Sequence, residues 1–215
     1  NGFSIYLSGH PHDCVTIFAV FVRKDYGNVG NFDSIIDIGG NIGIFALYGL
    51  ISGSKNCISF EPNSKAVQFA KNNIKLNKFE KCFEIKRLAV SEVDGSEIYI
   101  PKEPSMYNAI QKRISDDSSY YECCKTISLK SILDNYERID LVKIDCEGAE
   151  YSILFNCEKN VIQKVDNYRL EFHNYKSMAL VKFFKQNGFI NIFSDTDLST
   201  NPKEGILWFR KDNNG

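Results

Sequence analysis

The stretch SIIDIGGNIGIFALYGL, residues 34–50, decides the fold of this chain. Its first residues are mostly β-branched, which is typical of a short buried strand. Glycines follow at positions 39, 40 and 43, and an apolar run comes after them. Glycines between a strand and a helix allow a tight turn in which the backbone approaches a neighbouring group closely. The stretch therefore predicts a strand, a glycine turn and a helix.

Short β-rich runs alternate with helical patterns along the rest of the chain. This alternation is typical of an α/β domain with a mainly parallel sheet. We expect strands at Ser34–Ile38, Cys57–Glu61, Phe83–Ala89, Leu141–Asp145, Tyr168–Phe172, Phe189–Phe193 and Ile206–Arg210. We expect helices near Ile42–Ile51, Ser64–Leu76, Ser128–Tyr136, Ala149–Phe155 and Lys176–Asn187.

The two ends of the chain depart from the alternating pattern. The last two strands are joined by residues 194–204, which have no helical pattern, so we expect an antiparallel pair. The main domain is predicted over 33–215. The extension over 1–32 is predicted to contain two strands, Phe3–Leu7 and Val15–Val22, in a hairpin. Pro101–Ser119 is polar and irregular, and a loop of that length is usually functional or mobile.

The composition excludes several classes of protein. A chain of 215 residues that is 43% apolar and 25% charged is typical of one globular domain. The net charge of −1 provides no basic field for a nucleic-acid backbone. The longest apolar run, Val15–Val22, is far shorter than the roughly 20 residues of a membrane span. The seven cysteines show no C-x-x-C spacing, which favours reduced thiols in a cytoplasmic protein over zinc binding.

The glycine turn and two nearby carboxylates indicate a nucleotide-type cofactor. The glycines fall as G-G-x-x-G and therefore fail the G-x-G-x-x-G spacing of dinucleotide-binding folds. Glu61 ends the next expected strand, where a carboxylate can accept hydrogen bonds from both hydroxyls of a ribose. Asp37 precedes the turn and suits the cationic methionine end of S-adenosylmethionine, directly or through water. S-adenosylmethionine is thus favoured over NAD(P), while a glycine turn needed only for packing remains the alternative.

Five blocks carry a family resemblance: IDIGGNIG at 36–43, FEPN at 60–63, LAVSEVDG at 88–95, LVKIDCEGAE at 141–150 and LEFH at 170–173. In this order they resemble the motifs of FkbM-type methyltransferases over roughly residues 32–209. Gly40 stands where that family more often has alanine. The resemblance implies a seven-stranded Rossmann-like methyltransferase sheet, mostly parallel, with a C-terminal antiparallel hairpin and helices on both faces. It also implies S-adenosylmethionine-dependent methyl transfer to a hydroxyl of a sugar, glycan precursor or related small molecule, as in polysaccharide modification.

The expected cofactor-binding residues lie at the ends of successive strands. They are Asp37, Gly39, Gly40, Asn41, Gly43, Glu61, Pro62, Asn63, Leu88, Ala89 and Asp145.

The expected catalytic residues are Asp145, Glu147 and His173, near the ends of the fourth and fifth strands. Methyl transfer is an in-line displacement, and a hydroxyl acceptor must also lose a proton. His173 is the first choice for the general base, because the ordinary pKa of histidine is near neutral. Acidic residues at a helix start are also favoured by the helix dipole, so a structural role for Glu147 and Glu150 stays open. Metal dependence is not expected.

Several alternatives remain open from the sequence. Magnesium, if used, would be held by Asp145, Glu171 and Asn174, because oxygen ligands suit that ion. The expected partner is a small-molecule or carbohydrate acceptor. A phosphorylated acceptor is an alternative, given Lys112-Arg113 in the irregular segment. Tyr107, Asn108 and this basic pair are candidates to cover the acceptor, and a solvated loop is the alternative. Nucleic acid is not expected, because no Asn/Asp-Pro-Pro-aromatic motif follows the fourth strand, and an NAD(P)-dependent oxidoreductase is the alternative from another class.

Overall fold

The computed structural model describes residues 2–103 and 120–213. Seven strands form the main sheet: β1 Ser34–Ile38, β2 Asn56–Phe60, β3 Phe83–Lys86, β7 Ile139–Ile144, β8 Val165–Phe172, β9 Phe189–Ser194 and β10 Gly205–Lys211. Their order across the sheet is β3-β2-β1-β7-β8-β10-β9. The first five run parallel, and β10 is antiparallel to β8 and β9. The expected sheet and its C-terminal hairpin are confirmed.

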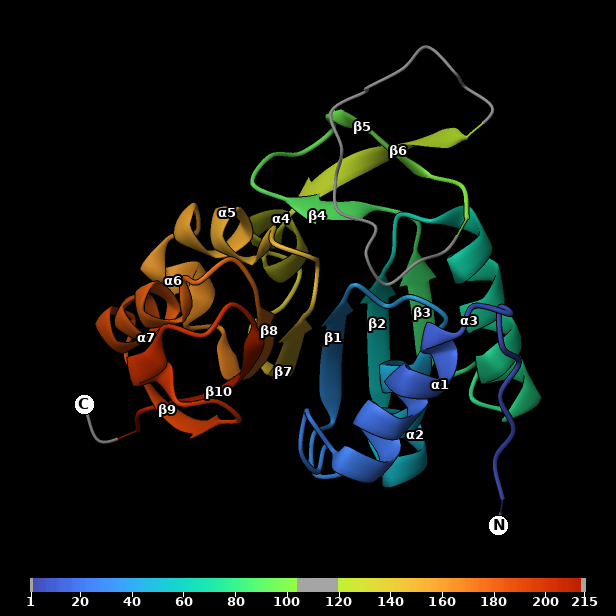
Figure 1. Cartoon of the computed structure of the whole chain (residues 1–215), viewed down its shortest axis with the longest axis horizontal. Helices are drawn as coiled ribbons and strands as arrows, with labels where there is room; N and C mark the ends of the chain where they lie inside the picture. The colour runs from blue at the N-terminus through green and yellow to red at the C-terminus, as the bar shows by residue number, and fades with distance from the viewer. Residues whose placement is uncertain (1, 104–119, 214–215) are drawn as a thin grey trace.

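Helices cover both faces of this sheet (Figure 1). Alternation along β1 explains the two layers, because successive side chains of a strand point to opposite faces. Ile35 belongs to a core shared with α2 (Ile44–Ser52) and α3 (Ser64–Leu76). Ile36 and Ile38 belong to the other core, whose helices are α4 Leu129–Leu133, α5 Glu150–Phe155, α6 Lys159–Ile162 and α7 Ser177–Gln186.

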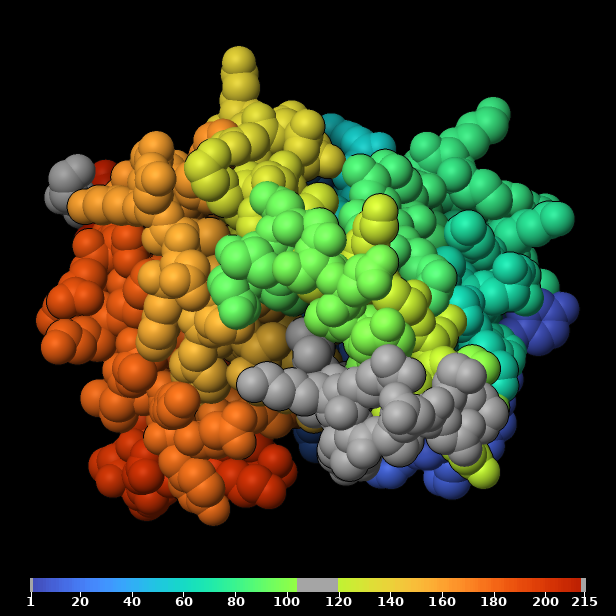
Figure 2. Space-filling view, turned by 90° about the horizontal axis from the view of Figure 1, so that it is seen from above, coloured from blue at the N-terminus to red at the C-terminus, as the bar shows by residue number. Residues whose placement is uncertain are grey.

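A second, three-stranded sheet lies beyond the carboxyl ends of the main strands (Figure 1). It consists of β4 Ala89–Ser91, β5 Glu97–Pro101 and β6 Tyr121–Ser128, in the order β4-β6-β5. Seen from that side, the segment with β4 and β5 lies between the N-terminal and C-terminal parts of the chain (Figure 2). The sequence predicted one strand over Phe83–Ala89. That strand breaks at Arg87 and Leu88, and its end pairs with β6 instead of the main sheet.

The predicted N-terminal hairpin is wrong. Residues 12–23 form a helix, α1 His12–Ile17 continued by the π-helical η1 Phe18–Arg23. One face of this helix packs on the core through Ile17, Val20 and Phe21, the last two being three and four positions after Ile17 in the chain. The opposite face is exposed and carries Val15, Phe18 and Val22. This spacing of the buried residues is that of a helix. The packing of one helix face on the core therefore outweighs the preference of β-branched residues for strands.

The first residues of the chain are held by side chains and not by a neighbouring strand. The amide of Asn73 accepts from the Tyr6 N–H at 2.6 Å and donates to the Tyr6 carbonyl at 3.1 Å. Asn77 makes the equivalent pair of bonds with Ser4. Two asparagines one turn apart, Asn73 in α3 and Asn77 directly after its end, therefore provide hydrogen-bond partners for the extended backbone that the sequence predicted to be a strand. The division of the chain at residue 32 stays a prediction.

Most of the predicted irregular segment, including Tyr107, Asn108, Lys112 and Arg113, lies outside the described residues. A 3-10 turn, η2 Leu198–Thr200, interrupts the connection between β9 and β10. Over the described ranges, no helix has the length and apolar character required to cross a membrane.

Candidate cofactor and acceptor site

The glycine turn after β1 is shaped by close backbone contacts. Gly39 has a φ of 80°, and a Cβ atom at this position would lie 1.8 Å from the carbonyl oxygen of Asp145. The N–H groups of Gly39 and Gly40 both donate to the Phe60 carbonyl, at 3.0 and 3.1 Å. The turn is thus fixed between the ends of β2 and β7, and only glycine fits at position 39.

Glu61 is held by the backbone on both of its oxygens. Oε2 accepts from the Asn41 N–H and Oε1 from the Asn63 N–H, each at 2.8 Å. Burial raises the pKa of Glu61 to about 7, although these two bonds lower it. Asn63 in turn caps α3, with its side chain accepting from the Ala66 N–H. The sequence FEPN therefore fixes a carboxylate beside the turn and starts a helix behind it.

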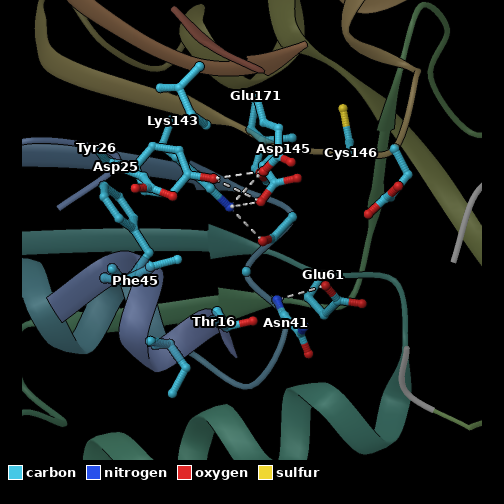
Figure 3. A pocket seen from close by; sticks show the side chains of 18 of the residues that line it. Thr16, Asp25, Tyr26, Asn41, Phe45, Glu61, Lys143, Asp145, Cys146 and Glu171 are labelled. Atoms are coloured by element: carbon cyan, nitrogen blue, oxygen red, sulfur yellow. Dashed lines mark hydrogen bonds and ion pairs between the residues drawn. The ribbon is translucent and has the colours of Figure 1, made fainter. Parts of the chain in front are cut away.

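A cavity of about 340 Å³ opens at the carboxyl ends of the main strands, beside the glycine turn. Figure 3 shows its walls, with Asn41 and Glu61 on one side and Asp145, Glu171 and Tyr26 on the other. Eight predicted cofactor-binding residues line it: Gly39, Gly40, Asn41, Glu61, Pro62, Asn63, Ala89 and Asp145. Asp37, Gly43 and Leu88 are not among its described lining residues. Gly43 packs on Ala70, and Leu88 lies against the core.

Asp37 is occupied by an internal ion pair. Its side chain is fully buried, with Oδ1 lying 3.2 Å from Lys143 Nζ and Oδ2 accepting from the Ser59 hydroxyl at 3.0 Å. Burial raises the pKa of Asp37, while Lys143 and Ser59 lower it. Asp37 is therefore not a described lining residue of the cavity, and its contact with a cofactor, directly or through water, stays a prediction.

Lys143 links the turn to the end of β7. Its ammonium donates to the Gly39 carbonyl at 2.9 Å and lies 3.4 Å from Asp145 Oδ2. Burial lowers the pKa of Lys143, but the charges of Asp37 and Asp145 outweigh this and raise it overall. The ammonium also lies 5.5 Å from the ring centroid of Tyr26, whose hydroxyl donates to Asp145 Oδ2 at 2.9 Å. One carboxylate oxygen of Asp145 thus faces both a hydrogen-bond donor, the Tyr26 hydroxyl, and a cation, the Lys143 ammonium.

Two more carboxylates of the cavity wall hold protons readily. The charge of Asp145 and burial raise the pKa of Glu171 to about 8. Burial and the charge of Asp145 raise the pKa of Glu147 to about 7. Like charges close together disfavour ionisation, and burial acts in the same direction. Groups with a near-neutral pKa at a cavity are suited to proton transfer.

His173 lies behind Glu147 and is not a described lining residue of the cavity. Its Nδ1 lies 3.2 Å from Glu150 Oε1, and its Nε2 lies 3.6 Å from Glu147 Oε2. Burial lowers the pKa of His173, but the hydrogen bond and charge of Glu150, with the charges of Glu147 and Glu171, raise it to about 9. At neutral pH the imidazole is therefore protonated, and this form cannot accept a proton.

Glu150 has the structural role that the sequence left open. It is fully buried, and its Oε1 accepts from the N–H groups of Cys146 and Gly148, both at 3.1 Å. Between those two residues Glu147 adopts a left-handed conformation, with a φ of 54°. Glu150 therefore shapes the turn that places Glu147 against the cavity.

The three candidate magnesium ligands do not all face one point. Asp145 and Glu171 line the cavity, whereas Asn174 is exposed in the turn after β8. In residues 2–103 and 120–213, no three histidine, cysteine, aspartate or glutamate side chains are arranged to hold a metal ion.

Sequence reasoning missed Lys143 and the N-terminal wall of the cavity. The sequence could have indicated Lys143, because a lysine inside the apolar run LVKID is expected to be buried and then needs a partner of opposite charge. No local pattern could have indicated Tyr26, because its hydrogen-bond partners lie 119 and 145 residues away in the chain.

Comparison with known proteins agrees with this geometry. The sequence matches the family described as "Methyltransferase FkbM domain" over residues 37–190. A search of curated proteins finds no match.

Similar solved structures include TrmK from M. capricolum in complex with S-adenosyl-homocysteine, at 14% identity over 85% of this chain and 64% of that chain, with a TM-score of 0.56. The ribosomal protein L11 methylase from Lactobacillus delbrueckii subsp. bulgaricus has 11% identity over 95% of this chain and 81% of that chain, with a TM-score of 0.55. A protein of the NADB-Rossmann superfamily from Streptococcus agalactiae has 15% identity over 100% of this chain and 73% of that chain, with a TM-score of 0.56. At these identities the likeness shows a shared fold.

Proposed function

The chain belongs to the FkbM methyltransferase domain family, and on that premise we propose that it is an S-adenosylmethionine-dependent O-methyltransferase for a neutral sugar, glycan precursor or related small molecule. The observation that carries the proposal is the cavity between the glycine turn and the strand ends, with Glu61 fixed at its edge by two backbone bonds. All seven cysteines are free, which agrees with a cytoplasmic protein.

The described residues fit the cofactor. Glu61 presents carboxylate lone pairs at the place where doubly wound folds bind a ribose. At Gly39 the Asp145 carbonyl occupies the space of a Cβ atom, so the glycine holds the turn against the end of β7, and both Gly39 and Asp145 line the cavity. When bound, the cofactor would supply a methyl group activated by a sulfonium. The chain's own residues then need to align the acceptor hydroxyl and remove its proton.

Glu147 is the residue that best suits removal of the proton. It lines the cavity, and its pKa of about 7 allows it to be deprotonated at neutral pH and still accept a proton. The protonated His173, with its Nε2 3.6 Å from Glu147, then stabilises the carboxylate form. The roles of His173 and Glu147 are therefore proposed as a pair, with Glu147 as the base. Asp145 lines the same wall and is proposed to orient the ligands.

The charge of the cavity wall favours a neutral acceptor. Lys143 is paired with Asp37 and Asp145, and Arg23 is paired with Asp25. The remaining acidic lining residues are Glu61, Glu147, Glu171, Asp195 and Glu204. Glu171, with its pKa of about 8, is mostly protonated at neutral pH, but none of these acidic groups attracts an anion. A phosphorylated sugar or a nucleic-acid backbone would find no free basic partner among the described lining residues, which disfavours binding. These acceptors remain the alternative to a neutral hydroxyl.

Incubation with labelled S-adenosylmethionine tests the proposed function. We expect methyl transfer to neutral methyl glycosides and none to their 6-phosphates, because the wall repels anions. The product should be an alkali-stable ether, and EDTA should leave the rate unchanged. In parallel, S-adenosylhomocysteine should raise the melting temperature, whereas NADPH should not.

Each part of this experiment has a result that would contradict the proposal. Transfer only to phosphorylated sugars or to RNA would contradict the neutral acceptor. Loss of activity in EDTA would establish a metal. Stabilisation by NADPH alone would favour an oxidoreductase.

Glu147→Gln tests the proposed base. The amide keeps the size of the side chain but cannot accept the proton, so we expect the transfer rate to fall roughly 100-fold. Affinity for S-adenosylhomocysteine, measured by calorimetry, should stay within about twofold. Glu137→Gln is the control, because Glu137 is exposed and does not line the cavity. An unchanged rate in Glu147→Gln would return the role of base to another residue of the wall.

A further inference from the structure

The N-terminal segment supplies a polar group to the cavity from outside the family match over 37–190. Tyr26 follows the end of η1, is 5% exposed, and lines the cavity with Asp145 and Glu171. Its hydroxyl lies 2.9 Å from Asp145 Oδ2 and 3.4 Å from Glu171 Oε2 (Figure 3). A phenol carries one proton, and the shorter distance identifies Asp145 as its acceptor.

The turn that carries Tyr26 is anchored on both sides. Lys24 has a left-handed conformation that ends the helix, and its carbonyl accepts from the Gly27 N–H at 2.7 Å. The indole N–H of Trp208 donates to the Asp25 carbonyl at 2.8 Å, and the Tyr48 hydroxyl donates to the Gly27 carbonyl at 3.0 Å. The carbonyls on either side of Tyr26 are therefore held by side chains of β10 and α2. A phenol on such a turn has a fixed position.

Tyr26 and Lys143 act on the same oxygen of Asp145. Both contacts involve Oδ2, at 2.9 Å from the phenol and 3.4 Å from the ammonium. Asp145 lines the cavity, and none of the described residues donates a hydrogen bond to its other oxygen, Oδ1. The carboxylate is thus fixed through one oxygen and retains the other for a ligand.

Asp145 also lies next to the glycine turn. Its N–H donates to the Ile38 carbonyl at 3.1 Å, and its own carbonyl occupies the space where a Cβ of residue 39 would be. Asp37, in contrast, is fully buried behind Lys143. A cationic group bound against the turn therefore meets the Asp145 carboxylate and not that of Asp37.

We propose that Tyr26 is a positioning residue of the cofactor site, and that it holds Asp145 so that this carboxylate receives the ammonium group of the cofactor's methionine end. The inference rests on the proposed function, because it presumes S-adenosylmethionine as the cofactor. Burial and the charge of Asp145 raise the pKa of Tyr26, so its hydroxyl remains a donor at neutral pH.

Two ligands that differ only at the methionine end provide the test. S-adenosylhomocysteine carries the ammonium group, whereas 5′-methylthioadenosine has the same adenosine and thioether without the amino-acid part. In calorimetry at pH 7, we expect Tyr26→Phe to weaken S-adenosylhomocysteine roughly tenfold, because one hydrogen bond to a charged group is lost. The affinity for 5′-methylthioadenosine should stay within about twofold.

Tyr168→Phe is the matched control for this substitution. Tyr168 is fully buried and loses a comparable hydrogen bond, to the Ile162 carbonyl at 3.1 Å, but it does not line the cavity. Asp145→Asn should reproduce the selective loss of S-adenosylhomocysteine affinity, and adding Tyr26→Phe to it should change little further. Asp145→Asn also gives the same comparison of ligands if Tyr26→Phe folds poorly.

The outcomes separate this inference from the proposed function. An equal loss for both ligands, no loss at all, or additive effects of the two substitutions would overturn the role of Tyr26. If the unaltered protein binds neither ligand, the proposed cofactor itself is refuted.

Discussion

Gly39→Ala is expected to remove about 4 kcal/mol or more of folding stability and to abolish binding of S-adenosylhomocysteine. The added methyl carbon would lie 1.8 Å from the carbonyl oxygen of Asp145, well inside van der Waals contact. Relief requires the ends of β1 and β7 to separate, although their residues are paired up to Ile38 and Ile144. The φ of 80° adds a conformational cost for any side chain. Urea unfolding and calorimetry measure the two effects.

Gly95→Ala separates the conformational cost from the steric clash. Gly95 has a similar φ of 73°, but nothing lies within 4 Å of the position of its Cβ. It should therefore lose only about 1–2 kcal/mol and keep ligand binding. Equal losses of stability in the two variants would contradict the close approach of the turn to Asp145.

The main sheet was predictable because each of its strands has a local signature. The run SIID before the glycines and LVKID before the acidic turn are apolar enough to be buried strands, and the sheet places them side by side with Ile36 opposite Val142. The hairpin of β9 and β10 followed from the absence of a helical pattern between them.

The N-terminal helix was not predictable from composition, because its β-branched residues favour a strand in isolation. The apolar residues Val15, Phe18 and Val22 are exposed, so the run looks apolar on all sides and conceals the helical period. The β5–β6 hairpin escaped for a different reason. A long polar segment separates its two strands in the chain, so a search for neighbouring strands joined by a short turn does not find their pairing.

The candidate cofactor site was suggested by the glycine spacing, whereas its electrostatics depend on contacts between residues distant in sequence. The pKa of His173 is near neutral in isolation, yet the carboxylates of Glu150, Glu147 and Glu171 raise it to about 9. That surrounding charge is a product of the fold. The sequence therefore indicated which titratable residues lie at the strand ends. Which of them is protonated at neutral pH depends on the charges that the fold brings around each one.

Lys143→Met is expected to cost about 3–5 kcal/mol, because it leaves the fully buried carboxylate of Asp37 without its cation. Among the described residues, the Ser59 hydroxyl alone would still hydrogen-bond to that carboxylate. Without the ammonium, the pKa of Asp37 rises further above its value in the unfolded chain. The loss of stability should therefore be smallest in acid, where Asp37 is protonated, and should grow as the pH rises through the raised pKa. Urea unfolding at several pH values measures this dependence.

Two variants distinguish a buried charge from the mere loss of a lysine. Lys164→Met removes a lysine that is 28% exposed and lies 3.4 Å from Asp134, and it should cost less than about 1 kcal/mol. Asp37→Asn combined with Lys143→Met should recover most of the lost stability and remove its pH dependence, since residue 37 then carries no unpaired buried charge. If the double variant is as unstable as Lys143→Met, the ion pair is not the cause, and the aliphatic stem of Lys143 in the packing of Tyr26 and Phe45 becomes the explanation.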